Sequence, residues 1–317
     1  MTSLRVKLGT RGSALALRQA HWVKERLEAS WPDFSVDLIP IRTRGDRILD
    51  TPLYQVGGKG LFLKEIEEAL LRKEIDCAVH SVKDVPADLP TGLHLAAIPE
   101  REDPRDVLIS RNGLLLGDLP AGACVGTSSL RRQAQLLAAR PDLEIKPLRG
   151  NVDTRLRKLK EGQLDAVILA WAGMHRLGLM DRVTQFLEPE VMIPAIGQGA
   201  LGVECRVEDP EINRLVLPLN HGLTSCAVRA ERAFLRRLEG GCQVPVAAHA
   251  SIRNDTCYIQ ALVASPDGKR VVRGRRVAPV SMAETAGVAL AEELLERGAG
   301  EILGEIYEKK YLKPDLL

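Results

Sequence analysis

Aromatic residues are scarce in this chain and make up only 3% of its 317 residues. The scarcity argues against a nucleic-acid binder, because single-stranded DNA and RNA sites rely on stacking between bases and aromatic rings. The net charge is only +2 at neutral pH, so no overall field attracts the chain to DNA or to a membrane surface. We therefore expect no nucleic-acid partner, and any anion binding must come from local clusters of basic residues.

Cysteine and long apolar runs are also limited. The six cysteines form no C-x-x-C pair, which indicates neither a disulfide framework nor a zinc site, and no metal is expected. No apolar stretch approaches the length of a transmembrane helix, and the first residues lead into a predicted strand rather than a targeting segment. These absences predict a cytoplasmic protein with no membrane partner.

Hydrophobic periodicity over the first two thirds of the chain alternates between strand and helix. The predicted strands cover 4–9, 34–42, 76–81, 123–126, 144–148 and 165–170. The predicted helices comprise one with apolar residues from Ala16 to Leu27, followed by 60–73, 128–139 and 154–160. Strands that alternate with helices predict parallel sheets with helices on both faces.

The last third of the chain has a different pattern. A helix is predicted over 224–239, followed by antiparallel strands over 244–252, 256–265 and 269–278. Residues 281–284 form a capping-box sequence that predicts the start of a final helix. The expected fold class is therefore α/β, with two doubly wound domains followed by an α+β domain that has an antiparallel sheet.

One segment, 126–132, has the composition of an anion site. It follows a predicted strand and opens a helix, so backbone N–H groups point to the same place as the side chains of Ser129, Arg131 and Arg132. The alternative is an ordinary helix N-cap with solvated arginines, and the segment alone does not separate the two.

Basic residues follow predicted strands elsewhere too. Arg11 and Ser13 lie between the first strand and the first helix. Arg149 and Arg155 flank another helix start, and Arg176 follows the strand 165–170. Ligands of doubly wound sheets bind at the carboxyl ends of strands, and arginine bonds carboxylates bidentately. The set predicts one cleft that holds a polyanion, whereas any single arginine could be a solvated surface residue.

Asp84 is the one strong acid candidate beside these cations. It lies just after the strand 76–81, next to Lys83. A lone carboxylate in a positive cleft can stabilise a developing cation or move a proton. The alternative is a structural turn aspartate that pairs with Lys83.

Cys242 stands apart from the other five cysteines. It follows Gly240-Gly241, the pair that ends the helix 224–239, so we expect it on an exposed loop where a thiol is available for chemistry. The others lie in predicted strands or near a helix start, where burial as small hydrophobic residues explains most of them.

Together these segments resemble the hydroxymethylbilane synthase (porphobilinogen deaminase) family, and the resemblance covers nearly the whole chain. The segments that carry it are 9–13, 57–62, 79–86, 126–132, 148–155, 197–202 and 231–242. The last of them resembles the family's cofactor-attachment signature. One departure lies at 173–178, where Met174 and His175 replace residues that the family more often has, although Arg176 is retained.

The resemblance implies three domains, of which the first two are like those of a periplasmic binding protein. Domain 1 would be discontinuous, with 1–99 and 200–217, domain 2 would comprise 105–195, and domain 3 would comprise 222–317. The resemblance also implies a dipyrromethane cofactor, built from the substrate porphobilinogen and bound to Cys242 through a thioether. We expect the protein to act as a monomer.

The implied reaction joins four porphobilinogens head to tail with loss of ammonia and then releases hydroxymethylbilane. The expected catalytic residues are Asp84 and Lys83. The residues expected to hold the cofactor are Cys242, Ser13, Lys83, Ser129, Arg131 and Arg132. The residues expected to bind the substrate are Arg11, Phe62, Arg149, Arg155 and Arg176, with Phe62 stacking on a pyrrole ring.

Two functions without catalysis remain as alternatives. A periplasmic-type solute-binding module would share the two-domain cleft, but it would lack an attached cofactor and would usually carry an export signal. The ligand-sensing domain of a transcription factor would need a DNA-binding motif, and the sequence shows none.

Overall fold

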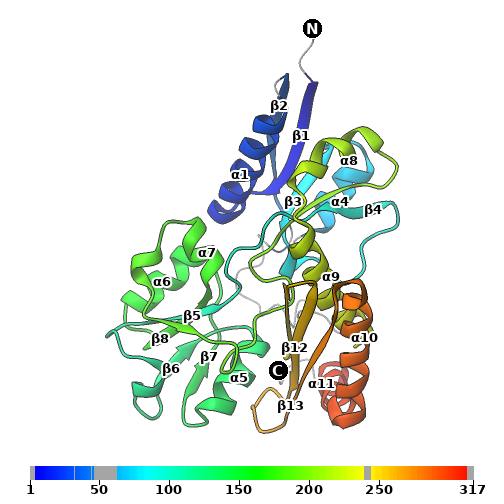
Figure 1. Ribbon diagram of the computed structural model, residues 1–317. Coiled ribbons are helices and arrows are strands. Elements are labelled where there is room, and N and C mark those ends of the chain that lie inside the picture. Colours follow the sequence, from blue (N-terminus) through cyan, green and yellow to red (C-terminus); the bar gives the residue numbers. More distant parts are fainter. Residues whose placement is uncertain (1–3, 32, 44, 46–62, 239–243, 313–317) are drawn as a thin grey trace.

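The computed structural model describes residues 4–31, 33–43, 45, 63–238 and 244–312. These residues form two five-stranded α/β units and a third unit built on a three-stranded sheet (Figure 1). The expected succession of two α/β domains and one α+β domain with an antiparallel sheet is confirmed. None of the described helices is long and apolar enough to span a membrane.

The first sheet has the strand order β2-β1-β3-β10-β4. Its strands are β1 (Leu4–Arg11), β2 (Phe34–Ile41), β3 (Cys77–Ser81), β4 (Leu93–Ala97) and β10 (Leu201–Arg206). Its helices are α1 (Ala14–Ser30), α4 (Lys64–Leu71) and α8 (Pro210–Val216). Helix α1 buries Ala20, Val23 and Leu27 in the core of this domain, as their spacing predicts. Of the predicted helix 60–73, the first residues lie outside the described part, and α4 supplies most of the rest.

The second sheet has the order β7-β6-β8-β5-β9. Its strands are β5 (Asp106–Ser110), β6 (Cys124–Gly126), β7 (Glu144–Lys146), β8 (Ala166–Ala170) and β9 (Gln185–Leu187). Its helices are α5 (Leu130–Ala139), α6 (Val152–Lys160) and α7 (Trp171–Arg176). The strands β5 and β9 were not predicted, whereas β6, β7, β8, α5 and α6 lie where periodicity places them.

Both sheets are mixed, so the expectation of parallel sheets is confirmed for β1 with β2 and β3 and for β6 with β7 and β8, and it is wrong for the remaining pairs. Strand β10 is antiparallel to β3 and β4, and β5 is antiparallel to β8 and β9. The register gives the reason: Leu201 pairs with Ser81 and Asp106 pairs with Ala170, so each of these strands begins where its neighbour ends. The chain thus enters each sheet at the carboxyl ends of strands, without the helix that a parallel crossover needs.

The third domain is the predicted antiparallel meander, with the order β11-β12-β13. Its strands are β11 (Val246–Arg253), β12 (Thr256–Ala264) and β13 (Val271–Pro279). Its helices are α9 (Gly222–Arg237), α10 (Ala283–Leu294) and α11 (Gly300–Leu312). The predicted capping box is wrong, because Val280–Met282 form a 3-10 turn and Met282 is the N-cap of α10 without a side-chain bond. The single final helix is also wrong, since Gly298 at φ +97° separates α10 from α11.

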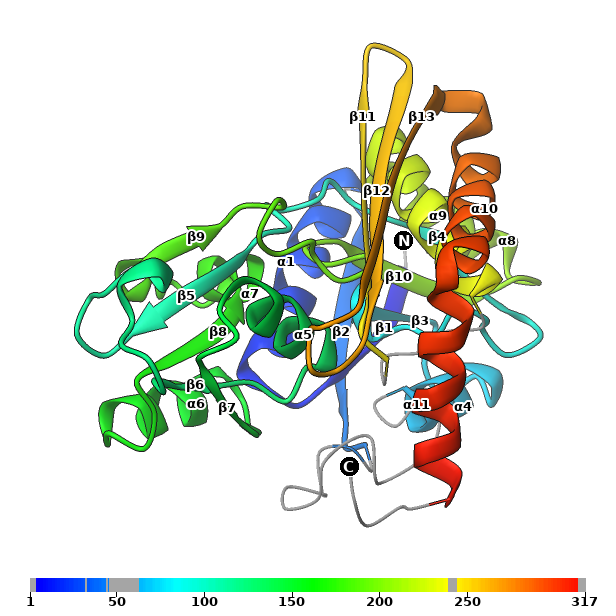
Figure 2. The same ribbon diagram turned by 90° about the horizontal axis from the view of Figure 1, so that it is seen from below.

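The turn between β12 and β13 packs directly on α5 (Figure 2). Gln133 Nε2 donates to the carbonyl of Pro266 at 3.1 Å. Gly268 has φ of +70°, and a Cβ there would lie 2.5 Å from the backbone nitrogen of Ala138. The third domain therefore holds the helix that carries Arg131 and Arg132.

Two segments cross between the five-stranded sheets: 98–105 and 188–200. One buried ion pair holds both of them to the third domain. Arg101 Nη1 donates to Glu231 of α9 at 2.5 Å, and Arg101 Nε donates to the carbonyl of Gln198 at 2.7 Å. Glu231 also accepts from the backbone N–H groups of Gly197 at 2.6 Å and Ala250 at 2.7 Å. Both crossovers therefore meet the third domain at one point.

Candidate active site

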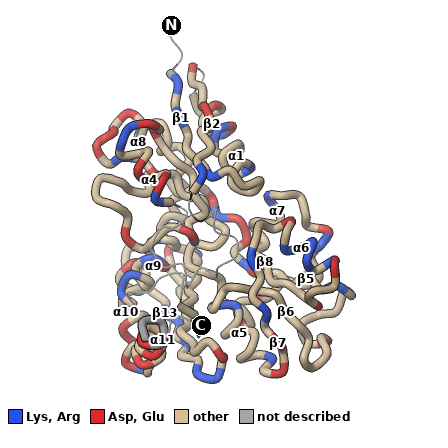
Figure 3. Tube along the Cα trace, turned by 180° about the vertical axis from the view of Figure 1, so that it is seen from behind, with Lys and Arg blue, Asp and Glu red and all other residues tan. Residues whose placement is uncertain are grey.

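The predicted site residues follow strand ends in both α/β domains. Arg11 ends β1, and the 3-10 turn after β3 contains Lys83 and Asp84. In the second domain, Ser129 caps α5 and Arg155 lies in the first turn of α6. Figure 3 shows basic residues of α6 and α7 on the side of the second domain that lies nearest to α1 and β1.

A small cavity of about 60 Å³ lies where β1 and β3 end. Arg11, Ser13, Gln19, Ser81 and Asp84 are among the residues that line it. Gln19 Nε2 donates to Ser81 Oγ at 3.0 Å, which fixes one wall. A cation, hydroxyl groups, an amide and a carboxylate thus face one small space that suits a polar group.

Asp84 lies among cations of both domains. Burial lowers the pKa of Lys83 to about 8, against the opposing charge of Asp84 and with a contribution from Arg132. Burial also lowers the pKa of Arg155 to about 10, together with the charges of Arg132 and Arg149, while Asp84 again opposes the shift. The charge of Asp84 therefore acts on Lys83 of its own domain and on Arg155 of the other.

Arg149 carries a donor that the described residues do not satisfy. Its Nη1 is buried and has no hydrogen-bond partner within the part of the chain that the structure describes. Leaving a buried guanidinium N–H without an acceptor is costly, so an anion placed beside it would be stabilised. The neighbouring Arg155 is held by a bond from its Nε to the carbonyl of Gly150 at 2.9 Å.

Arg131 and Arg132 are buried and paired with Asp106, the first residue of β5, so they are not solvated arginines. Each places a guanidinium nitrogen 2.7 Å from a carboxylate oxygen of Asp106, and Gln198 Nε2 donates to the same group at 3.0 Å. Burial alone would raise the pKa of Asp106, but the two guanidiniums outweigh it and hold the pKa well below its usual range. The expectation that Asp84 is the one strong acid beside these cations is therefore wrong.

The two predicted serines act as helix N-caps. Ser13 Oγ accepts from the N–H of Ala16 at 3.3 Å, and Ser129 Oγ accepts from the N–H of Arg132 at 3.4 Å. The N-cap alternative given for 126–132 therefore holds for Ser129, and Ser13 caps α1 in the same way. It does not exclude a ligand, because each hydroxyl can still donate its proton to an anion at the same helix N-terminus.

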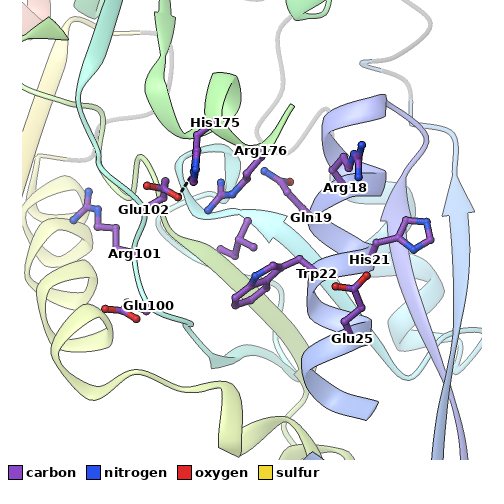
Figure 4. Close-up of a pocket in the computed structure, with 11 residues that line it drawn as sticks. Arg18, Gln19, His21, Trp22, Glu25, Glu100, Arg101, Glu102, His175 and Arg176 are labelled. Carbon is purple, nitrogen blue, oxygen red and sulfur yellow. Dashed lines mark hydrogen bonds and ion pairs between the residues drawn. The ribbon is translucent and has the colours of Figure 1, made fainter. Parts of the chain in front are cut away.

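Arg176 lies at a different and larger cavity of about 550 Å³, beside α1, α7 and the crossover 98–105 (Figure 4). Its Nη2 donates to the carbonyl of Gly199 at 2.7 Å. Neither Asp84 nor Lys83 lines this cavity, and Gln19 lines both cavities. Arg176 and Asp84 therefore line two neighbouring cavities that share Gln19.

Phe62 and Cys242 lie outside the described residues. The buried cysteines are poor alternatives as nucleophiles, because burial raises the pKa values of their thiols. These cysteines are Cys77, Cys205, Cys226 and Cys257. Within the described ranges, no group of three or more His, Cys, Asp or Glu side chains could hold a metal ion.

A buried cluster of acids and an imidazole was not predicted from the sequence. His80 Nε2, at the small cavity, lies 2.9 Å from Glu204 Oε2, and both side chains are buried. Burial raises the pKa of Glu67 to about 7, with the charge of Glu204 adding to the shift and His80 opposing it. The available signal was a polar residue inside an apolar run, as at His80 in β3.

Two family models match this chain. The model described as "Porphobilinogen deaminase, dipyromethane cofactor binding domain" matches residues 6–214. The model described as "Porphobilinogen deaminase, C-terminal domain" matches residues 225–296, a range that includes Cys242.

Curated relatives are similar over almost their full length. A porphobilinogen deaminase of Geobacter metallireducens is 57% identical over 310 residues, which cover 98% of this chain and 97% of the relative. One of Pelobacter propionicus is also 57% identical over 310 residues, covering 98% of this chain and 100% of the relative. Among solved structures, a putative methionine-binding lipoprotein of Bacillus subtilis covers 69% of this chain and 90% of its own, with 11% identity and a TM-score of 0.42.

Proposed function

This chain belongs to the porphobilinogen deaminase family, and we propose that Asp84 and Lys83 carry out its chemistry in a cleft whose arginines bind carboxylates. The enzyme is a transferase of tetrapyrrole and haem biosynthesis. It joins four porphobilinogens head to tail on a dipyrromethane cofactor, losing one ammonia at each addition, and releases hydroxymethylbilane by hydrolysis.

The side chains around Asp84 fit a dipyrromethane, whose two pyrroles bear four carboxylates. The cationic residues there are Arg11, Lys83, Arg131, Arg132, Arg149 and Arg155. Only Asp84 and Asp106 oppose them among the acids described above, and the buried Nη1 of Arg149 has no acceptor within the described chain. When bound, the cofactor supplies the free pyrrole carbon at which chain growth begins.

We assign the cofactor to the helix N-terminal serines and to the cations around Asp84 and Asp106. Ser13, Lys83, Ser129, Arg131 and Arg132 would hold its carboxylates, and Cys242 would carry its thioether. The serines lie at helix N-termini and Lys83 lies beside Asp84, so these groups can present hydrogen bonds and positive charge to one polyanion.

Asp84 has two tasks in this proposal. When ammonia leaves the aminomethyl group of porphobilinogen, the C–N electron pair goes with nitrogen and a positive charge remains on the methylene-pyrrole. The carboxylate of Asp84 stabilises that charge. After the new C–C bond forms, a proton must leave the attacking ring carbon, and the same carboxylate accepts it.

Lys83 complements Asp84 by binding a carboxylate close to the reacting carbon. With a pKa of about 8, its ammonium is mostly charged at neutral pH. Arg11 lines the small cavity with Asp84, and Arg149 and Arg155 approach from the second domain. We assign these three arginines to the acetate and propionate groups of the substrate, because their planar forks bind carboxylates in two-point contacts.

The substrate roles of Phe62 and Arg176 stay predictions, because neither residue is among those described around Asp84. Phe62 would stack on a pyrrole ring, but it lies outside the described residues. Arg176 would bind a substrate carboxylate at the larger cavity and not beside Asp84.

We also propose a cytoplasmic monomer without a nucleic-acid partner. Acidic and basic residues are mixed along the described chain in Figure 3, and the net charge is only +2.

A solute-binding module or a ligand-sensing domain would not explain matches to both a cofactor-binding model and a separate C-terminal model, which together span 6–214 and 225–296.

The position of Asp84 in the lining of the small cavity with Arg11, and its electrostatic interaction with Lys83 and Arg155, are the observation that carries this assignment. Asp84→Asn removes the charge and keeps the shape, and we expect kcat to fall by about 10²–10³ while porphobilinogen still binds. Asp88→Asn is the matched control, because Asp88 is exposed and pairs with Arg236 at 2.8 Å. Near-normal turnover of Asp84→Asn would move the catalytic role to another residue.

A further inference from the structure

The three residues after Asp84 belong to no helix or strand, so their backbone carbonyls need partners from elsewhere. Val85 closes the 3-10 turn by donating its N–H to the carbonyl of Val82 at 3.0 Å. The carbonyls of Val85, Pro86 and Ala87 all accept from one arginine of α9, the first helix of the third domain. The turn that carries Asp84 therefore continues into a segment that another domain holds.

That arginine is Arg232, whose guanidinium spans the three carbonyls. Its Nη1 donates to Val85 at 3.3 Å, and its Nη2 donates to Pro86 at 2.7 Å and to Ala87 at 2.9 Å. The planar guanidinium holds several donors in a fixed arrangement, whereas the ammonium of lysine is a single centre on a flexible stem. Arg232 can therefore fix the path of this segment in a way that a point charge cannot.

Arg232 is buried, although its acceptors are neutral. Its side chain is 8% exposed, and it forms no ion pair with any residue that the structure describes. Burial lowers the pKa of Arg232, with Arg236 adding to the shift and Asp88 and Glu204 opposing it. By contrast, Arg236 is exposed and pairs with Asp88 at 2.8 Å. Because burying a cation is costly and an apolar side chain would fill the same space, bonding geometry explains Arg232 better than packing does.

Helix α9 also holds the other end of the turn. Val228, four residues before Arg232, is buried in one apolar cluster with Val82, the first residue of the turn. Residues four apart lie on the same face of a helix, so one face of α9 contacts the chain on both sides of Asp84. The chain then runs from the end of α9 directly to Cys242. One helix thus precedes the cofactor cysteine and supports the catalytic turn.

We propose that Arg232 is a positioning residue of the reaction, which fixes the backbone that carries Asp84 relative to the helix before Cys242. The inference rests on the proposed function, because Arg232 acts through Asp84 and does not touch the substrate. Without Arg232, the three carbonyls lose their donors and the turn shifts to find others. A displacement of about 1 Å can lower a rate by about 10², so the shift slows the reaction.

Steady-state kinetics of the holoenzymes test this role. In Arg232→Gln, kcat should fall by roughly 10², because the guanidinium that holds the segment is gone. KM for porphobilinogen should stay within about twofold of wild type, since the arginines assigned to the substrate are unchanged. In Arg232→Lys, which keeps the charge but not the planar fork, kcat should fall about tenfold, as expected for one charge-assisted hydrogen bond. Arg229→Gln is the matched control, because Arg229 is exposed on the same helix and pairs with Glu284 inside the third domain.

A double-variant cycle shows whether Arg232 acts through Asp84. The rate of the first addition is read from intact masses in a single turnover of Asp84→Asn, Arg232→Gln and the double variant. The double variant should match Asp84→Asn within about twofold, because a side chain without the catalytic charge loses little more when it is displaced. Rate losses that multiply in the double variant would place the effect of Arg232 elsewhere and overturn the proposal.

Thermal melting separates this role from a purely structural one. Arg232→Gln should melt at a lower temperature than wild type, so kcat is measured well below that temperature and per holoenzyme counted by intact mass. If Arg232→Gln does not fold, Arg232→Lys undergoes the same tests. A folded Arg232→Gln or Arg232→Lys with the kcat of wild type overturns the positioning role. Near-normal turnover of Asp84→Asn refutes the proposed function itself, whereas a slow Asp84→Asn beside a fully active Arg232→Gln refutes only the role of Arg232.

Discussion

Replacing Asp106 with Asn removes the charge that holds two buried guanidiniums. Asp106 is fully buried and accepts from Arg131, Arg132 and Gln198. Asn keeps the shape but places a neutral amide beside two cations. Breaking a buried ion pair from one side costs about 3–5 kcal/mol, and because two cations lose their partner here, we expect a loss near the upper end of that range.

Urea unfolding of three proteins measures this loss: wild type, Asp106→Asn and Asp118→Asn. Asp118 is exposed and forms no ion pair in the described chain, so its variant should stay within about 0.5 kcal/mol of wild type. For Asp106→Asn, a loss of about 4–5 kcal/mol should lower the urea midpoint by at least about 1 M, given typical slopes of roughly 1–3 kcal/mol per M.

The pH dependence gives a second test of the same reasoning. The guanidiniums hold the pKa of Asp106 below its usual value of about 3.9, despite the opposing effect of burial. A depressed folded-state pKa contributes stability that is fully present above the unfolded-state pKa and is lost as the pH falls through the folded-state pKa. The gap between wild type and variant should therefore be constant from pH 5 to 8. A gap below about 1 kcal/mol, or one that changes across that interval, would refute the role of Asp106 as the counter-ion.

Three further outcomes follow from the site. Cys242→Ser should fold without the dipyrromethane adduct and melt at a lower temperature than wild type at low salt, because the cations of the cleft then repel one another; an intact mass that includes the adduct would contradict this. In Cys242→Ser, which would lack the cofactor carboxylates, porphobilinogen binding should weaken as the pH rises above about 8, because Lys83, whose pKa burial lowers to about 8, then loses its charge. Lys83→Arg in the same background should lack that dependence, and a constant Kd of Cys242→Ser from pH 7 to 9 would argue against Lys83. Arg149→Gln should stop chain growth early, visible as a truncated ladder of covalent masses, and a complete ladder would leave its buried donor without a role.

Periodicity predicted the elements whose apolar residues repeat over several turns or alternate over a long strand. Helix α1 is an example, since Ala20, Val23 and Leu27 are buried at the predicted spacing. Strand β5 was missed because a run as short as Val107 to Ile109 between polar residues has no distinctive period. Strand β9 was missed because no predicted helix follows it, unlike β6 and β7, which are equally short. The direction of β5 and β10 depends on where the chain crosses between sheets, which no local pattern records.

The candidate site was predictable in its residue types and less so in their partners. Strand ends followed by arginines indicated where anions bind, but the pairing of Arg131 and Arg132 with Asp106 depends on how β5 enters the sheet. Arg176 was grouped with the others because it follows β8, yet α7 places it at a different cavity. The roles of Phe62 and Cys242 stay predictions.

The contact between Arg101 and Glu231 joins both crossovers to the third domain at one point. A rotation of one sheet against the other would therefore have its centre there. In a rotation, an atom moves further the further it lies from the centre. Gln198 is bonded to Arg101 at that centre, so Gln198 and its hydrogen-bond partner Asp106 would shift little. The residues of α1 and α7 that line the larger cavity lie on different sheets, so such a rotation would change the width of that cavity while the charges at Asp106 keep their geometry.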